Sequence, residues 1–213
     1  MSTPQSAADA PAPPLPRRRF IEGAAGTRSE AFGPAEWALV AGIALIWGSS
    51  FLFIDIALDG FAPGAIALFR LALGAFTLAL VPRARRPVAR EDLGRVAFLG
   101  AIWMAVPLVL FPVAQQWIDS AVAGMINGAV PLAAAAWSVL LLGRLPGRVQ
   151  RAGLLVGFLG VLAISWPEVQ DSRATALGAA LIVLAVILYG LAVNVAVPLQ
   201  QRYGSLPVLL RAQ

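Results

Sequence analysis

Residues 121–142 read AVAGMINGAVPLAAAAWSVLLL, an apolar run without a charged side chain. An α-helix rises about 1.5 Å per residue, and the hydrocarbon layer of a bilayer is about 30 Å thick. Roughly 20 consecutive apolar residues therefore suffice to cross it as a helix. The run is long enough to span a membrane.

Five further apolar runs accompany this one, and each is bounded by proline, glycine or charge. In chain order the six runs are Trp37–Ala57, Pro63–Val81, Leu93–Phe111, Ala121–Leu142, Ala152–Trp166 and Ala174–Pro198. The fifth run is short, so we expect it to extend a turn into its flanks or to thin the bilayer locally. The pattern predicts an all-α polytopic membrane protein with about six transmembrane helices.

The composition supports a membrane location. Hydrophobic residues make up 59% of the chain and charged residues only 13%, against about 25% charged residues in soluble domains. The net charge of +5 would suggest nucleic acid in a soluble protein. Here the basic residues are arginines in short loops, so we expect no nucleic-acid partner. Without cysteine or histidine, no metal site and no cofactor are expected.

The loops predict the orientation of the chain. Residues 1–36 are rich in alanine, proline and serine and are predicted to form a disordered tail. Arginines occupy the tail and every second loop, namely Arg17, Arg18, Arg19, Arg28, Arg83, Arg85, Arg86, Arg90, Arg144, Arg148 and Arg151. The alternate loops carry Asp59, Asp119, Glu168 and Asp171, with Arg173 as their only base. The positive-inside rule then places the tail and the N-terminus in the cytosol, with the helices in the plasma membrane.

A charged residue inside an apolar run needs a physical reason. Arg70 lies within the second run, and Asp55 lies near the same end of the first run. One interpretation is an Asp55–Arg70 pair or a contact between Arg70 and an anionic substrate. The alternative is that Arg70 extends to the lipid headgroups while Asp55 lies at the interface.

The fourth run contains a proline that interrupts backbone hydrogen bonding. Pro131 lacks the donor that would bond to the carbonyl of Asn127. A freed carbonyl is costly in lipid, so it should face protein or a water-filled cavity, and the alternative is a packed kink without a ligand. Close helix packing is expected at the glycines Gly124, Gly128, Gly153, Gly157 and Gly160.

Polar and aromatic side chains within the runs are candidates for a substrate pathway. The candidate residues are Trp47, Ser49, Ser50, Asp55, Arg70, Gln116, Asn127, Pro131 and Trp137. For the tryptophans, ordinary packing is an equal explanation. Neither paired carboxylates nor a serine in a nucleophile context is found, so no catalytic residue is predicted and an enzyme is not expected.

Three stretches carry a resemblance to a known family. They are Trp47-Gly48-Ser49-Ser50-Phe51 followed by Pro63 and Leu68-Phe69-Arg70, then Ala114–Ala121 through Asn127 and Pro131, then Leu140–Gly143 followed by Gly153–Val161. Together they resemble the drug/metabolite transporter superfamily in its EamA-type branch. The resemblance implies ten spans in two inverted repeats of five around a central cavity. Residues 37–166 would form a complete first repeat, and residues 174–213 would begin a truncated second repeat with its first helix.

The resemblance implies a secondary transporter, an exporter that moves small organic metabolites or drugs across the plasma membrane by alternating access. The alternative is a non-transporting membrane interaction protein or an inactive truncated transporter fragment. The expected partners are a small-molecule substrate and the lipid bilayer. A homo-oligomer is expected if the truncated chain is functional.

Overall fold

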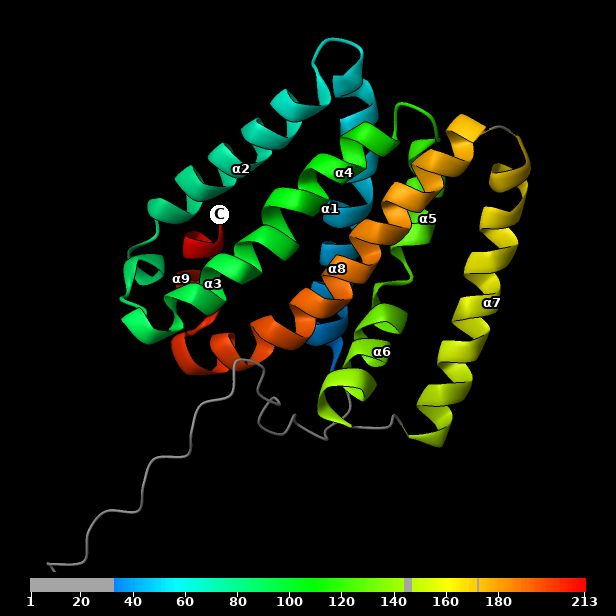
Figure 1. Ribbon diagram of the computed structural model, residues 1–213. Coiled ribbons are helices and arrows are strands. Elements are labelled where there is room, and N and C mark those ends of the chain that lie inside the picture. Colours follow the sequence, from blue (N-terminus) through cyan, green and yellow to red (C-terminus); the bar gives the residue numbers. More distant parts are fainter. Residues whose placement is uncertain (1–32, 144–146, 172) are drawn as a thin grey trace, which may run out of the picture.

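The computed structural model describes residues 33–143, 147–171 and 173–213, and it contains helices without any strand over these ranges (Figure 1). The α-helices are α1 (Pro34–Leu58), α2 (Pro63–Ala79), α3 (Leu93–Leu99), α4 (Val106–Ala114), α5 (Ser120–Asn127), α6 (Val130–Leu142), α7 (Arg148–Asp171), α8 (Arg173–Tyr203) and α9 (Ser205–Ala212). The shorter elements are the 3₁₀ turns η2 (Pro82–Arg85) and η3 (Arg90–Asp92) and the π-helix η4 (Gly100–Ala105). The predicted all-α class is confirmed. Most of the predicted tail and Arg144 lie outside the described residues.

Each of the six apolar runs is helical in the structure. Four segments are long and apolar enough to cross a membrane: Pro34–Leu58, Arg90–Ala114, Ser120–Leu142 and Thr175–Tyr203. The second run forms the shorter helix α2, of 17 residues, and the fifth run lies within α7, of 24 residues. These apolar helices support a multi-pass membrane protein.

Prolines interrupt the third and fourth spans. In the third span, Pro107 lacks the backbone donor for an ordinary helical bond, and the six residues of η4 before α4 form a π-helix. In the fourth span we expected one helix with Pro131 in its interior. Instead α5 ends at Asn127 and α6 begins at Val130, so that Pro131 lies in a first helical turn, where its missing donor costs little.

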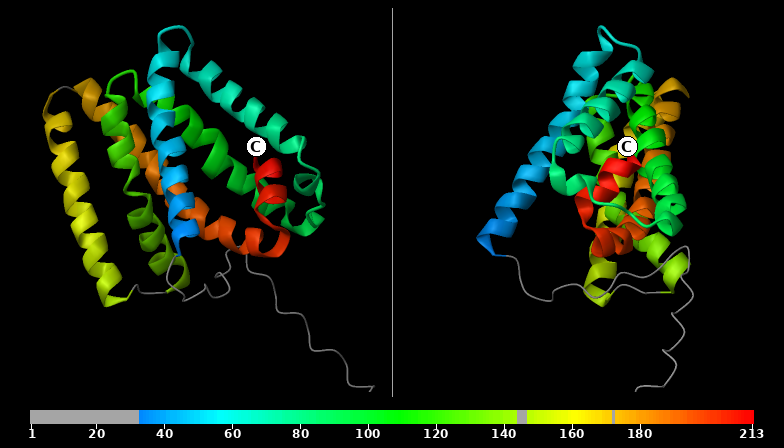
Figure 2. Two further views of the ribbon diagram at one scale, coloured as in Figure 1. Left: turned by 180° about the vertical axis from the view of Figure 1, so that it is seen from behind. Right: turned by 90° about the vertical axis from the view of Figure 1, so that its left-hand side faces the viewer.

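Helix α8 is the centre of the bundle. It crosses the molecule obliquely and contacts α4, α5, α6, α7 and α9, with α2 and α7 at opposite edges (Figures 1 and 2). Two side-chain hydrogen bonds of 3.0 Å join it to α6: Trp137 Nε1 donates to the Ile187 carbonyl, and Asn194 Nδ2 donates to the Ala134 carbonyl. At Gly190 an added Cβ would lie 2.5 Å from the α6 backbone. The close approach of α6 and α8 therefore requires glycine.

The glycine predictions have mixed outcomes. A Cβ at Gly124 would lie 3.3 Å from the Phe51 ring, so the expected close packing is confirmed there, whereas one at Gly128 would meet only Met125 of its own segment. In α7 the expectation is wrong, because a Cβ at Gly153 or Gly160 would meet no described atom within 4 Å, and one at Gly157 would only reach contact distance. Helix α7 lies at the edge of the bundle, where its glycine face meets open space.

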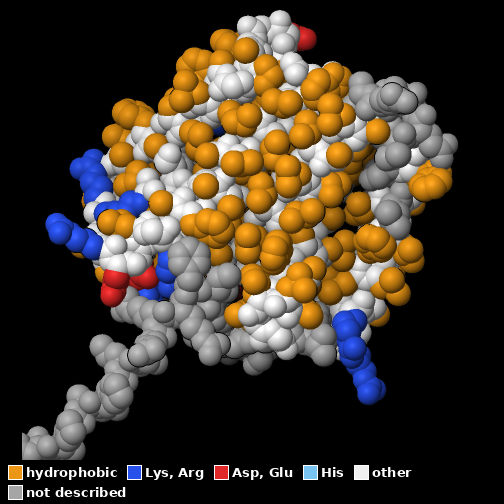
Figure 3. Space-filling model, viewed as in Figure 1, with side chains coloured by type: hydrophobic (Ala, Val, Ile, Leu, Met, Phe, Trp, Pro, Cys, Tyr) orange, Lys and Arg blue, Asp and Glu red, His pale blue; other side chains and the backbone are white. Residues whose placement is uncertain are grey.

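Charged side chains separate from apolar ones on the surface. Hydrophobic side chains cover the broad middle of the face shown in Figure 3, and basic side chains lie at its left edge and lower right. The arginine-bearing segments at η2 and at the start of α7 lie at one end of the bundle, whereas the turns with Asp59 and Asp119 lie at the other (Figure 1). This arrangement fits a chain that crosses back and forth. Which end faces the cytosol stays a prediction.

A buried charge cluster joins the start of α3 to the end of α8. Asp92 is 2% exposed. It accepts hydrogen bonds from Tyr203 Oη at 2.6 Å, Arg202 Nη1 at 2.7 Å and Arg95 Nη1 at 3.4 Å. Arg95 is also buried. The cluster connects segments about 110 residues apart, and no sequence pattern pointed to it.

Candidate functional site

A cavity of about 570 Å³ lies between α1 and α2. The two helices meet at the turn before Pro63 and then diverge (Figure 2). The turn is held to α1 by the Phe61 amide, which donates to the Ala57 carbonyl at 2.9 Å. The polar lining side chains are Ser49, Ser50 and Arg70, and the rest of the lining is apolar. Ligand cavities in proteins usually combine apolar walls with a few polar groups in this way.

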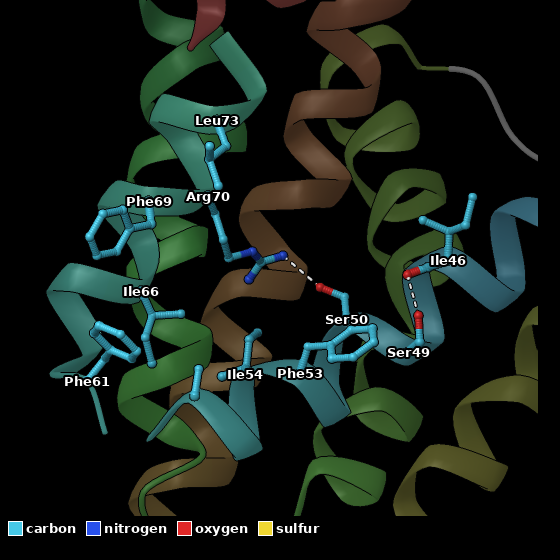
Figure 4. Close-up of a pocket in the computed structure, with 11 residues that line it drawn as sticks. Ile46, Ser49, Ser50, Phe53, Ile54, Phe61, Ile66, Phe69, Arg70 and Leu73 are labelled. Carbon is cyan, nitrogen blue, oxygen red and sulfur yellow. Dashed lines mark hydrogen bonds between the residues drawn. The ribbon is translucent and has the colours of Figure 1, made fainter. Parts of the chain in front are cut away.

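Arg70 is the main polar group of the cavity. Its side chain extends from α2 toward α1 (Figure 4), where Nη2 donates a hydrogen bond of 2.8 Å to Ser50 Oγ. Its other terminal nitrogen, Nη1, is buried and has no hydrogen-bond partner among the described residues. A buried polar atom without a partner is rare in native proteins and calls for an explanation, such as an ion or a ligand.

A second cavity, of about 350 Å³, also borders Ser50 and Arg70. It is lined in addition by Ile43, Ile46 and Trp47. The Trp47 ring meets the buried Tyr189 of α8 edge to face, with ring centroids 6.4 Å apart. The Ser50–Arg70 pair thus lies where two cavities meet, and an aromatic contact links this region to the central helix.

Of the interpretations of Arg70, the pairing with Asp55 is contradicted by the structure. Asp55 is exposed, and within the described chain Arg70 bonds to Ser50 instead. The helical phase explains the difference. Five residues turn an α-helix by about 140° beyond one full turn, so a helix that directs Ser50 at Arg70 directs Asp55 elsewhere.

The remaining candidates are divided between separate places. Of the nine predicted pathway residues, the two cavities bring together Trp47, Ser49, Ser50 and Arg70. Gln116 is exposed in the turn after α4, Pro131 is exposed, and Trp137 bonds to α8. Asn127 lies apart from the α1–α2 lining, but its Oδ1 is buried without a partner in the described chain. Its role as a cavity-lining residue stays a prediction.

Gln116 was predicted to be a pathway residue, whereas its neighbour Gln115 was not. Gln115 is buried, and its Nε2 donates a hydrogen bond of 2.9 Å to the Phe51 carbonyl, one residue beyond Ser50. It therefore holds α1 against the end of α4 beside the site. No sequence signal separated the two glutamines, because the preceding run is apolar on every side and only the structure shows that the face of Phe111 is buried.

The described residues contain no group of three or more aspartate, glutamate, histidine or cysteine side chains that could hold a metal ion. The polar groups that do converge are hydrogen-bond donors on apolar walls. The arrangement is suited to binding a ligand that supplies acceptors.

Comparison with known proteins relates this chain to membrane transporters. The model of the EamA-like transporter family matches residues 36–166, which include the α1–α2 site. A protein of Archaeoglobus fulgidus named "Uncharacterized transporter" is 26% identical over 142 residues, covering 67% of this chain and 51% of the relative. "Uncharacterized transporter YdfC" of Bacillus subtilis is 28% identical over 124 residues, covering 57% of this chain and 40% of the relative. The chain thus spans about half the length of these relatives or less. No solved structure matches it.

Proposed function

The chain belongs to the EamA-like transporter family, and from this membership we propose that it works as a secondary transporter of small organic metabolites or drugs. Both relatives carry the word transporter in their names, and the apolar helices support a multi-pass membrane protein. The finer proposal is export across the plasma membrane by alternating access, with the N-terminus in the cytosol.

The observation that carries the proposal is the cavity between α1 and α2. Its volume of about 570 Å³ lies within the range of about 300–1,000 Å³ that is usual for small-molecule sites. Secondary transporters bind their substrates in cavities near the middle of the bilayer. Arg70 lies inside an apolar helix, where a charge that served no ligand would cost at least about 2.5 kcal/mol at the bilayer centre.

The repeat organisation is also a proposal. Helices α1 to α7 cover residues 37–166, the predicted first repeat of five runs, and α8 would open the inverted second repeat. Because the match covers only 51% and 40% of the two relatives, we propose that the working transporter contains further helices. A second copy of the chain would supply them if the chain acts as it stands.

Transport can be tested with the purified chain in proteoliposomes. The assay measures uptake and efflux of a labelled panel of amines, amino acids, organic acids and drugs, with and without an imposed proton gradient. Flux above that of protein-free liposomes is expected for at least one compound class. Absence of flux for the whole panel, with helicity intact by circular dichroism, would contradict the proposal and favour a non-transporting membrane interaction protein.

A matched pair of variants connects any flux to the cavity. Ala57 is half-buried and lines the cavity, whereas Ala72 is exposed on α2 outside the lining. Ala57→Trp should reduce flux by about tenfold or more, because the ring fills the space that the substrate needs. Ala72→Trp should leave it within about twofold, since a substitution at an exposed site changes little. Equal flux in both variants would place the pathway elsewhere.

A further inference from the structure

We propose that the ligand of the α1–α2 cavity is an organic anion, with a carboxylate or similar oxygen acid at one end and an apolar body at the other. This inference rests on the proposed function, because it names the substrate class of the same site. Two hydrogen-bond donors at the site, one on Arg70 and one on Ser50, have no acceptor in the described chain.

The first donor is Arg70 Nη1. The guanidinium carries five N–H groups in a planar fork, and the bond to Ser50 uses only Nη2. Nη1 is buried, and the described chain offers it no acceptor. Arginine binds carboxylates through two parallel bonds more readily than through one, so an unused nitrogen beside a cavity matches an oxygen acid.

The second donor is the hydroxyl of Ser50. Its oxygen accepts from Arg70, and its own hydrogen has no acceptor in the described part of the chain. The neighbouring Ser49 differs, because its hydroxyl donates back to the Ile46 carbonyl at 3.1 Å. Ser50 and Arg70 can therefore donate to the same ligand oxygen, or to the two oxygens of one acid group.

The charge of Arg70 meets no carboxylate among the described residues that line the cavities. The described lining of the two cavities contains no aspartate or glutamate. Asp55, the carboxylate that the sequence offered as a partner, is exposed and does not line either cavity. An anion completes such a site, whereas a cation would be repelled at close range in a medium of low dielectric constant.

The apolar walls of the α1–α2 cavity indicate what the uncharged part of the ligand is. Phe61 and Phe69 meet edge to face with ring centroids 6.0 Å apart, and Phe53 also lines the cavity (Figure 4). Such walls favour aromatic or branched apolar groups. The ligand class is thus a small amphipathic acid whose charged end is at Arg70 and whose body lies along the phenylalanines.

The test compares an acid with its neutral isostere on the full chain in dodecyl maltoside micelles, which carry no anionic group. The probes are 4-phenylbutyrate and 4-phenylbutyramide, and binding is measured by equilibrium dialysis with labelled compounds. Hydrogen bonds between ionised groups are about twice as strong as neutral ones. The wild-type chain should therefore bind the acid at least about tenfold more tightly than the amide.

Variants assign that preference to the proposed donors. Arg70→Gln should abolish the preference for the acid, Arg70→Lys should keep part of it, and Ser50→Ala should weaken acid binding several-fold. Arg86→Gln, at an exposed arginine outside both cavities, is the matched control and should bind as the wild type does. Circular dichroism and size-exclusion chromatography verify folding, and the charge-preserving Arg70→Lys keeps the comparison valid if Arg70→Gln misfolds.

Each result of these binding measurements either supports or overturns the anion inference. Equal binding of acid and amide, absence of binding by either, or a preference that survives Arg70→Gln would overturn the inference. A lipid phosphate could supply the same chemistry, so phosphatidylglycerol is added to the micelles. Persistent probe binding supports a free acid, and displacement at a low lipid fraction would overturn the substrate assignment.

The transport proposal and the anion inference would be contradicted by different results. Flux of neutral or cationic compounds that Arg70→Gln leaves unchanged would overturn the anion inference and leave the transport proposal standing. Acid binding that depends on Arg70, without flux of any compound in the panel, would support the site and contradict transport.

Discussion

Replacing Asp92 tests whether the charge cluster between α3 and α8 stabilises the bundle. The carboxylate is buried and accepts hydrogen bonds from Tyr203, Arg202 and Arg95. In Asp92→Ala the buried guanidinium of Arg95 loses its ion pair with Asp92. We expect the free energy of unfolding to fall, because removing one member of a buried ion pair is costly.

The magnitude follows from burial and geometry. A hydrogen bond to a charged group contributes about 1.5–3 kcal/mol. The 3.4 Å bond from Arg95 is long, and the Arg202 side chain is 31% exposed, so water can replace part of its contact. The loss should thus lie near the lower end of the roughly 3–5 kcal/mol seen for broken buried pairs. Asp92→Asn keeps one acceptor oxygen and should cost about half as much.

The assay is reversible unfolding in mixed micelles with increasing sodium dodecyl sulfate, followed by circular dichroism. Asp119→Ala is the matched control, because Asp119 is exposed and makes no side-chain cap hydrogen bond to α5. It should change the free energy of unfolding by no more than about 0.5 kcal/mol. An Asp92→Ala variant as stable as Asp119→Ala would refute the structural role of the cluster.

Three further predictions concern the packing of α8 and the candidate pathway. Gly190→Val should destabilise the chain by about 1–3 kcal/mol or more, because the new side chain collides with α6, and Gly153→Val in the open face of α7 should stay within about 0.5 kcal/mol in the same unfolding assay. Asn194→Ala removes the donor to the Ala134 carbonyl and should cost about 0.5–2 kcal/mol, and a neutral result would mean that this bond adds no net stability. Asp55→Asn should leave proteoliposome flux within about twofold, since Asp55 is exposed and lies outside the cavity lining, and loss of flux would return it to the pathway.

The helices were predictable because apolar length dominates in a bilayer. A long apolar run has few alternatives to a helix in hydrocarbon, where every backbone polar group must be bonded internally. The run Leu93–Phe111 is helical throughout, as expected. Its π-helix was not predicted, because Pro107 marks an interruption without stating which local geometry resolves it.

The site was only partly predictable, because side-chain partners depend on how helices are rotated against each other. Arg70 stood out as a charge inside an apolar run, but its partner depended on whether α1 turned Ser50 or Asp55 toward α2. The short turn between the helices sets that rotation, and hydropathy does not encode it. The bond between Asp92 and Arg202 joins residues far apart in the chain. Because the chain has many arginines, charge alone does not identify which of them pairs with Asp92.

The central position of α8 has a consequence for biosynthesis. The inner faces of α4, α5 and α6 pack against a helix that the ribosome makes after all of them. About 60 residues separate the end of α6 from the end of α8, and at roughly 5–20 residues per second that stretch takes about 3–12 seconds to synthesise. During this interval the Trp137 indole has no Ile187 carbonyl to bind. The nascent helices therefore remain in the insertion machinery or in lipid until α8 is made. Chaperones and proteases of the membrane would meet the chain in this incomplete form.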